Sequence, residues 1–229
     1  MTKLGGLFYP SETASGEPIP FENHFIPYIY LETYIEGIYK DILNGKSDMV
    51  IIDCGANIGC TTQYFRDFAK QIYSIEPSTE HFDALTKNKE FNNWDNVSIH
   101  KVALSGEDGE RYLGLNEINH TMHSLMPQEG EEMAKRAGWT SGERVRTMTL
   151  DTFLKENNIE HVDFMKLDCE GVEDEILRHP TAKNALEKID SILIEMHHAN
   201  FPELVRYLQE LGYSARKYQS SAKIVLFTK

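Results

Sequence analysis

The 229-residue sequence is poor in cysteine and contains no long apolar run. Its cysteines, Cys54, Cys60 and Cys169, are odd in number and have neither a disulfide-framework nor a zinc-site spacing, so we expect reduced thiols that pack as small residues. The first residues, from Met1 to Gly6, lack the apolar core of a signal peptide. No stretch of about 18 apolar residues occurs, so no membrane span is expected. These absences predict a cytoplasmic protein without a membrane partner.

Basic residues are also scarce. Lysine and arginine together number 23, against 36 aspartates and glutamates, and the net charge is -13 at pH 7. Because phosphate backbones are bound by clustered Lys and Arg, this balance argues against a nucleic-acid partner. The best basic patch, Lys135, Arg136, Arg144 and Arg146, is more simply explained as solvated charge beside a strand. With 41% hydrophobic and 26% charged residues, the composition is that of a globular protein. The length of 229 residues predicts one domain with additional segments.

What the sequence does contain is a buried strand followed by a glycine turn and a helix. The apolar run Met49–Ile52 ends in Asp53, glycines at 55 and 59 follow, and a helical pattern begins at Thr61. This is the opening unit of a doubly wound α/β domain, in which ligands lie at the carboxyl ends of the strands. The spacing G-x-x-x-G differs from the dinucleotide fingerprint G-x-G-x-x-G, which disfavours a nicotinamide cofactor. A short G-x-x-x-G can also be a plain tight turn, so its weight depends on the motifs further along the chain.

Strand and helix patterns alternate through the rest of the chain. Strands are expected at 71–77, 97–104, 145–150, 161–168 and 191–196, with a closing antiparallel pair at 213–217 and 223–227. Helices are expected at 28–43, 61–70, 79–92, 151–157, 173–178 and 202–211. The helix spacing predicts core faces made by Tyr28, Leu31, Ile35, Ile38 and Ile42, by Tyr64, Phe65 and Phe68, and by Phe82, Leu85 and Phe91.

The domain organisation follows from this pattern. Residues 1–23 are rich in Pro, Gly and Ser and predict an irregular leader, so residues 1–48 form a leader and helix packed on or over the core. Residues 49–229 form the main domain, with an irregular insertion near 110–145. Such a long insertion is usually functional or mobile.

An acid ends the second predicted strand. Glu76 stands just before Pro77, which breaks the strand. A carboxylate can accept two hydrogen bonds from a vicinal diol, and α/β cofactor enzymes hold ribose hydroxyls at this position. Glu76 is therefore a candidate ribose ligand.

Three blocks of sequence together carry a resemblance to a known family. They are Val50-Ile-Ile-Asp-Cys-Gly-Ala-Asn-Ile-Gly59, Ile75-Glu-Pro77 and Phe164-Met-Lys-Leu-Asp-Cys-Glu-Gly171, and Val102-Ala-Leu-Ser105 and Ile194-Glu195 add to them. In this combination, residues 49–200 resemble the FkbM family of S-adenosylmethionine (SAM) dependent methyltransferases. The resemblance implies a doubly wound, seven-stranded, Rossmann-like class I methyltransferase sheet with helices on both faces, an N-terminal helical extension and SAM as cofactor. One departure from the family is Cys54, where an aliphatic residue is common.

The resemblance also implies a set of cofactor residues. It places the glycine loop beside the methionine part of SAM, Glu76 at the ribose, and Ala103 with Leu104 beside adenine. A serine-rich turn of the family lies near the cofactor, which points to His123 and Ser124, although a surface histidine is the simpler interpretation of His123. The predicted cofactor-binding residues are Asp53, Gly55, Asn57, Gly59, Thr61, Glu76, Pro77, Ala103, Leu104, Ser124 and Asp168.

Methyl transfer to a hydroxyl requires alignment of the acceptor and removal of a proton. The candidates stand at the ends of the fourth and fifth strands; the predicted catalytic residues are Asp168, Glu170, Glu195 and His197, with His198 as a further candidate. Other interpretations remain open. Asp168 or Glu170 could cap the next helix, and Glu195 with His197 could form a base and its orienting partner, a divalent-metal site with Asp168, or a structural hydrogen bond. No metal is predicted, and Lys166 is expected to pair with an acid across the sheet.

The sequence therefore predicts a SAM-dependent O-methyltransferase acting on a hydroxyl of a small metabolite or sugar. The substrate class rests on the family resemblance alone. Two alternatives remain open: a non-catalytic SAM-binding module that contacts partners through its N-terminal helix, and a nicotinamide-dependent oxidoreductase. A homodimer is also compatible with the sequence.

Overall fold

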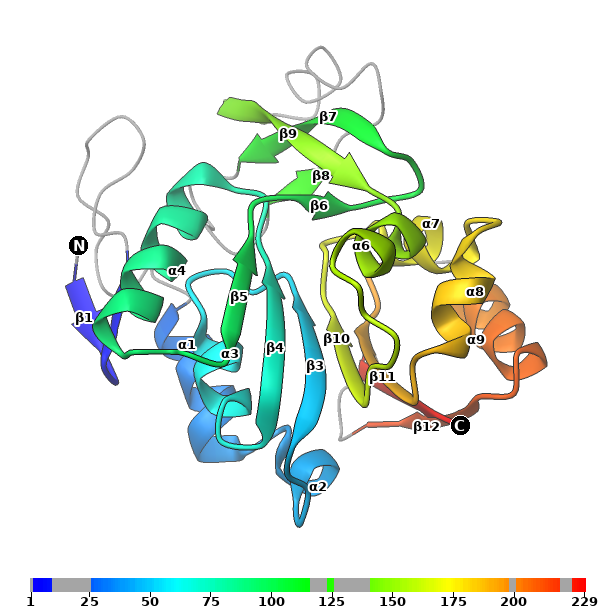
Figure 1. Ribbon diagram of the computed structural model, residues 1–229, viewed down its shortest axis with the longest axis horizontal. Coiled ribbons are helices and arrows are strands. Elements are labelled where there is room, and N and C mark those ends of the chain that lie inside the picture. The colour runs from blue at the N-terminus through cyan, green and yellow to red at the C-terminus, as the bar shows by residue number, and fades with distance from the viewer. Residues whose placement is uncertain (1, 10–25, 116–122, 126–140, 198–200, 219–223) are drawn as a thin grey trace.

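A central sheet of seven strands organises the molecule (Figure 1). The computed structural model describes residues 2–9, 26–115, 123–125, 141–197, 201–218 and 224–229. The strand order in the sheet is β12-β13-β11-β10-β3-β4-β5. The bounds are Met49–Cys54 for β3, Ala69–Ile75 for β4, Val97–His100 for β5, Phe164–Leu167 for β10, Ser191–Glu195 for β11, Ser214–Lys217 for β12 and Ile224–Thr228 for β13.

The sheet order reverses beside β3. From β3 the chain steps outward through β4 to β5, and it returns to place β10 on the other side of β3. The strands from β5 to β11 run parallel, whereas β13 is antiparallel to both β11 and β12. The closing antiparallel pair predicted from the sequence is confirmed. Loops leaving β3 and β10 diverge in opposite directions, which opens a crevice at the carboxyl ends of these strands.

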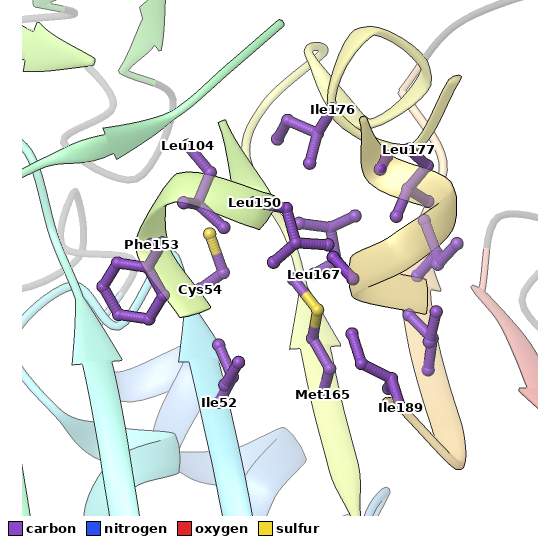
Figure 2. Close-up of a cluster of buried hydrophobic side chains, with 14 of the residues drawn as sticks. Ile52, Cys54, Leu104, Leu150, Phe153, Met165, Leu167, Ile176, Leu177 and Ile189 are labelled. Atoms are coloured by element: carbon purple, nitrogen blue, oxygen red, sulfur yellow. The ribbon is translucent and has the colours of Figure 1, made fainter. Parts of the chain in front are cut away.

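Helices cover both faces of the sheet because side chains alternate along each strand. Ile52 and Cys54 point to one face and pack with α6 (Leu150–Glu156), α7 (Glu173–Arg178), α8 (Ala182–Glu187) and α9 (Phe201–Glu210). Figure 2 shows part of this cluster, including Ile52 and Cys54 of β3 and Leu150 and Phe153 of α6. Met49 and Ile51 point to the other face and pack with α2 (Lys40–Leu43), α3 (Cys60–Phe65) and α4 (Thr79–Phe91).

A second sheet stands beyond the carboxyl ends of β4 and β5 (Figure 1). Its strands, in the order β6-β9-β7-β8, are Ala103–Leu104 for β6, Ser141–Met148 for β9, Gly109–Leu115 for β7 and Ser124–Leu125 for β8. The prediction of one strand over 97–104 was wrong. β4 ends at Ile75, opposite His100, so the chain has no further partner in the first sheet and pairs with β9 instead. The rest of the predicted insertion, 116–122 and 126–140, lies outside the described residues.

The N-terminal residues form a hairpin rather than an irregular leader. β1 (Thr2–Leu4) and β2 (Leu7–Tyr9) pair antiparallel. The side chain of Asn88, on α4, accepts a hydrogen bond from Phe8 N at 2.6 Å and donates one to Phe8 O at 2.9 Å. The hairpin is thereby fixed to the main domain. Residues 10–23, the remainder of the predicted leader, lie outside the described residues.

The helix predicted over 28–43 is broken into three parts. They are α1 (Ile26–Tyr30), the π-helix η2 (Leu31–Glu36) and α2, and Gly37 ends η2 in the left-handed region with φ +65°. A π-helix turn takes more residues than an α-helix turn, so residues three and four apart no longer share a face. Accordingly Ile38 and Ile42 are buried as predicted, but the other three members of the predicted core face, Tyr28, Leu31 and Ile35, are 42% to 71% exposed.

Other helix predictions need smaller corrections. The helix predicted over 61–70 ends at Phe65, because β4 already begins at Ala69. Phe91, expected in the core, is the last residue of α4 and is half exposed, with its ring 5.2 Å from that of Phe8. The helix α8 was not predicted; it begins two residues after Pro180. Among the described residues, no helix has the length and apolar character needed to cross a bilayer.

Candidate active site

A cavity of about 520 Å³ lies at the carboxyl ends of the central strands. Most of its wall comes from the glycine loop after β3, the ends of β4, β10 and β11, the second sheet, and the N-terminal segment α1–η2. The volume falls within the range of about 300–1,000 Å³ typical of small-ligand sites. The cavity therefore occupies the crevice created by the reversal of strand order.

The glycine loop requires both of its glycines. Gly55 has φ +77° and Gly59 has φ +95°, where L side chains are strained. A Cβ on Gly55 would collide with the carbonyl oxygen of Asp168, and one on Gly59 would lie 2.8 Å from Leu85 Cδ1. Gly55 N donates to Ile75 O at 3.1 Å, which folds the loop against the end of β4. The loop thus lies directly against the backbone that follows β10.

Asp53 lies behind this loop. It is completely buried, and its Oδ2 accepts hydrogen bonds from Thr61 Oγ1 and Thr62 Oγ1, each at 2.7 Å. Thr61 lines the cavity, but Asp53 does not. The carboxylate therefore joins the end of β3 to the first turn of α3.

Glu76 lies at the cavity wall with its carboxylate fixed. Its Oε2 accepts from Asn57 N and its Oε1 from Ser78 N, both at 2.9 Å. Burial raises the pKa of Glu76 to about 7, and these two hydrogen bonds oppose the shift. Each carboxylate oxygen accepts more than one hydrogen bond. Glu76 can therefore still receive two hydroxyl donors, as a ribose diol requires, and Pro77 lines the cavity beside it.

The second sheet forms an apolar wall of the same cavity. Ala103 and Leu104 of β6 line it, together with Leu113 of β7 and Leu125 of β8. All four are buried, and they provide an apolar surface suited to a flat ring. His123 also lines the cavity.

Ser124, predicted beside the cofactor, is instead turned toward the loop after β10. Its hydroxyl donates to Glu170 O at 2.9 Å, and the residue is not part of the cavity wall. The second sheet therefore contacts the site in two ways: His123 and Leu125 close the cavity, and Ser124 holds the neighbouring loop.

The part of the cavity wall at the ends of β10 and β11 is acidic, and we call it the acidic end. Asp168, Glu170 and Glu195 line it from the ends of β10 and β11. Two further carboxylates reach it from the π-helix η2, namely Glu32 and Glu36. This end therefore differs in character from the apolar wall of the second sheet.

Lys166 pairs with the acids of two neighbouring elements, as predicted. It stands opposite Asp53 in the register of β3 and β10, and its Nζ lies 3.7 Å from Asp53 Oδ1 and 3.3 Å from Asp168 Oδ2. Burial works to lower the pKa of Lys166, but the charges of Asp168 and Asp53 raise it well above its ordinary value. Lys166 is therefore a fixed cation beneath Asp168.

His197 brings the predicted catalytic residues together. Its Nε2 lies 3.4 Å from Glu170 Oε2 and 3.9 Å from both Asp168 Oδ1 and Glu195 Oε1. Burial works to lower the pKa of His197, but the hydrogen bond to Glu173 and the surrounding carboxylates raise it to about 9. At neutral pH this side chain is an imidazolium within an acidic cluster. The second histidine candidate, His198, lies outside the described residues.

Two carboxyl groups of this cluster, those of Glu170 and Glu195, have a pKa above the ordinary range. Burial raises the pKa of Glu170 to about 7; the charge of His197 opposes this shift and that of Asp168 adds to it. Burial, followed by the charge of Asp168, also raises the pKa of Glu195. A carboxylate with a pKa near 7 is well matched to accepting a proton at neutral pH.

Glu173 is a residue of this site that the sequence did not reveal, as are Glu32 and Glu36 of η2. It is buried, and its Oε1 accepts from Cys169 N and Gly171 N, each at 3.1 Å, and from His197 Nδ1 at 2.9 Å. Burial works to raise the pKa of Glu173, but the hydrogen bond from His197 and the other donors lower it. In sequence Glu173 looks like an ordinary acid in a first helical turn. The only available signal was its place three residues after Glu170.

Three members of the cluster have the donor set that a divalent cation would use. Asp168, Glu170 and His197 bring their ligand atoms within 4.8 Å of one another. Oxygen-rich sets of this kind suit Mg²⁺ or Mn²⁺, although such an ion would have to displace the proton on His197 Nε2. A second group, His161, Asp163 and Asp190, precedes β10 and β11 and so lies at the opposite edge of the sheet.

The cysteines are free thiols, as predicted. Cys54 Sγ lies 3.1 Å from Cys169 Sγ, and both residues line the cavity. Cys60 is buried, and burial raises the pKa of its thiol to about 12. The thiols fill space where the glycine loop meets the loop after β10.

The comparisons with known proteins decide the family. A family model described as the methyltransferase FkbM domain matches residues 53–215, which include every strand of the central sheet from β4 to β11. The chain belongs to the FkbM methyltransferase family. The resemblance inferred from the three sequence blocks is thereby confirmed, and the family is one of SAM-dependent methyltransferases.

Individual relatives are distant. Methyltransferase 1 of Beauveria bassiana is 27% identical over 186 residues, which cover 75% of this chain and 73% of that protein. The hexuronic acid methyltransferase AglP of Haloferax volcanii is 23% identical over 157 residues, which cover 66% of this chain but only 57% of its own length. A solved structure, precorrin 8W decarboxylase of Methanobacterium thermoautotrophicum, is 13% identical with a TM-score of 0.50 and full coverage of both chains. The similarity to this solved structure supports a shared fold only.

Proposed function

We propose that this FkbM-family chain is an O-methyltransferase that methylates a hydroxyl group of a small metabolite, with a sugar as the favoured acceptor. The observation that carries the proposal is one cavity with two different ends. The glycine loop, Glu76 and the apolar wall of the second sheet form one end, and a cluster of carboxylates around His197 forms the other. A transferase for a neutral acceptor needs both a cofactor site and a group that accepts a proton.

The first end fits SAM. Glu76 offers a carboxylate for the ribose hydroxyls, Ala103 and Leu104 offer an apolar surface for adenine, and the glycine loop lines the cavity through Gly55, Ala56 and Asn57. The carboxylates beyond the loop suit the positive charge of a sulfonium group. When bound, SAM supplies an electrophilic methyl group on that sulfonium.

The acidic end provides groups that can orient the acceptor and accept its hydroxyl proton. Asp168 and Glu195 line the cavity and can accept hydrogen bonds from acceptor hydroxyls, which orients them. Glu170, with its pKa of about 7, is the group best matched to receive the hydroxyl proton. His197 stays protonated beside Glu170 Oε2 and stabilises the carboxylate form until that proton arrives.

The acidic end of the cavity and the name of one relative both support a sugar as acceptor. Carboxylates only accept hydrogen bonds when ionised, so an acidic end that contains five of them favours a ligand with several hydroxyl donors. In addition, the relative from Haloferax volcanii is named for methylation of a hexuronic acid. The same proton-accepting cluster favours an enzyme over a non-catalytic SAM-binding module, and family membership favours methyl transfer over hydride transfer.

The test is a methyl-transfer assay with labelled SAM and a panel of hydroxylated acceptors: methyl glycosides, hexuronic acids, and a simple phenol as a non-sugar. We expect transfer to at least one sugar, loss of transfer in Glu170→Gln, and a methyl ether in the product NMR spectrum. A methyl ester of a uronic acid would contradict methylation of a hydroxyl. Transfer to the phenol alone would contradict the sugar, and no transfer to any acceptor, although SAM binds, would favour the non-catalytic module.

A further inference from the structure

Glu173 is a buried acid that lies just outside the cavity and contacts two elements of its acidic end. It stands in the first turn of α7 and is only 3% exposed, but it is not among the residues that line the cavity. Burial of a carboxylate is costly unless hydrogen bonds or a cation compensate for the lost water. The groups that donate hydrogen bonds to the buried carboxylate of Glu173 are therefore the groups that it holds in place.

The first contact is to the loop that carries two of the acids of the cavity. Glu173 Oε1 accepts hydrogen bonds from Cys169 N and Gly171 N, the two backbone groups on either side of Glu170. Glu170 itself has φ +53°, a conformation that non-glycine residues rarely adopt. The hydrogen bonds at both flanks hold this turn, and so hold the side chain of Glu170 at the cavity wall.

The second contact is to the histidine after β11. The same Oε1 lies 2.9 Å from His197 Nδ1, and this bond fixes both the orientation and the protonated nitrogen of the ring. The other nitrogen, Nε2, is thereby directed toward Glu170 and Asp168. One carboxylate oxygen thus joins the ends of two adjacent parallel strands, β10 and β11.

We propose that Glu173 is the positioning residue of the acidic end: it holds the Glu170 turn and His197 in the one arrangement that lets Glu170 take a proton from the acceptor. Glu173 does not touch the acceptor. This inference rests on the proposed function, because it assigns a role within the same site. Among the described residues, the charged groups that face His197 are Asp168 and Glu170 from the loop after β10, Glu173 from α7, and Glu195 from β11.

Two substitutions separate the negative charge of Glu173 from its ability to accept hydrogen bonds. Glu173→Gln keeps an oxygen that can accept the same hydrogen bonds but removes the negative charge beside His197. Glu173→Ala removes both. Asp174→Asn is the matched control, because it removes a charge from the same first helical turn, where Asp174 pairs with Arg178 near the surface.

The primary measurement is an NMR titration of the His197 ring in the wild type, in Glu173→Gln and in Asp174→Asn, with the signal assigned through His197→Asn. We expect the wild-type midpoint near 9. In Glu173→Gln the midpoint should fall by about one pH unit or more, and in Asp174→Asn it should not move. This measurement needs no acceptor, so it tests the contact between Glu173 and His197 separately from the proposed methyl transfer.

The second measurement is steady-state kinetics with the sugar acceptor identified in the transfer assay. We expect Glu173→Ala to lower kcat by about a hundredfold, and Glu173→Gln by about tenfold, with the dissociation constant for SAM changed less than about twofold. An unchanged His197 midpoint in Glu173→Gln would overturn the proposal. So would loss of SAM binding with an unchanged kcat at saturation, because Glu173 would then act on the cofactor end of the cavity. If Glu173→Ala does not fold, the Gln variant decides alone.

Discussion

The ammonium group of Lys166 lies between the carboxylates of Asp53 and Asp168, 3.7 Å from the first and 3.3 Å from the second. Lys166 and Asp53 face one another on adjacent strands, and both are buried. Within the described part of the chain, Asp53 Oδ1 accepts no hydrogen bond, so Lys166 is what compensates its charge. A lysine on β10 thus links the acid behind the glycine loop to the acid at the cavity.

Replacing Lys166 by methionine should destabilise the protein. The change leaves Asp53 buried without a compensating charge, and removing one partner of a buried pair costs about 3–5 kcal/mol. Urea unfolding of Lys166→Met should therefore show a free energy of unfolding lower by about 3 kcal/mol. Arg146→Met is the control, because Arg146 and its partner Glu156 are both exposed and the change should cost about 0.5 kcal/mol. Equal effects of the two changes would contradict the role given to the buried pair.

The glycine at position 55 should be irreplaceable for steric reasons. In Gly55→Ala the new methyl group would collide with the carbonyl oxygen of Asp168, in addition to the strain of φ +77°. Gly45→Ala carries nearly the same strain, φ +73°, but has open space around its Cβ. We expect Gly45→Ala to cost about 1 kcal/mol and Gly55→Ala about 2 kcal/mol more, measured by urea unfolding. Similar costs for both would show that the loop does not press against the end of β10.

SAM binding should strengthen as the pH rises through 7. Burial raises the pKa of Glu76 to about 7, and a ribose diol donates hydrogen bonds that favour the ionised carboxylate. Below pH 7 the protonated form dominates, so the dissociation constant for SAM should rise by up to about tenfold per pH unit. Calorimetry between pH 6 and 8.5 measures this, and Glu76→Gln should bind more weakly with a flat profile. A sloping profile in the Gln variant would assign the pH dependence to another group.

Catalysis should also depend on pH through Glu170. Its carboxylate form must accept the proton, so kcat should fall as the pH drops below about 7, the pKa of this group. In Glu170→Gln we expect kcat to fall by about a hundredfold or more, while the affinity for SAM stays within about twofold. Pre-steady-state methyl transfer with SAM bound separates these quantities. A Gln variant that retains wild-type kcat would remove Glu170 from the role of base.

The sequence was sufficient to predict most of the central sheet. Buried parallel strands such as β3 read as continuous apolar runs, and the acids that end them stand where parallel strands meet at one edge. For that reason Asp168, Glu170, Glu195 and His197 could be grouped from sequence, and the structure brings them together around His197 Nε2. Their chemical roles in methyl transfer belong to the proposed function.

What could not be predicted depends on partners distant in the chain. Nothing local in residues 97–104 shows that β4 ends opposite His100, so the transfer of β6 to a second sheet was missed. The π-helix η2 has no signature in the spacing of its apolar residues, and it turned Tyr28 and Ile35 outward. Glu173 was missed because its partner His197 lies on another element.

We propose above all that the cavity at the ends of β3 and β10 binds SAM, with Glu76 at the ribose. Calorimetric titration of the purified protein with SAM and S-adenosylhomocysteine tests it most directly, with NAD as the control ligand and Glu76→Ala beside the wild type. We expect saturable SAM binding in the micromolar range, lost or strongly weakened in Glu76→Ala, and no binding of NAD. Absence of SAM binding, or binding indifferent to Glu76, would contradict it.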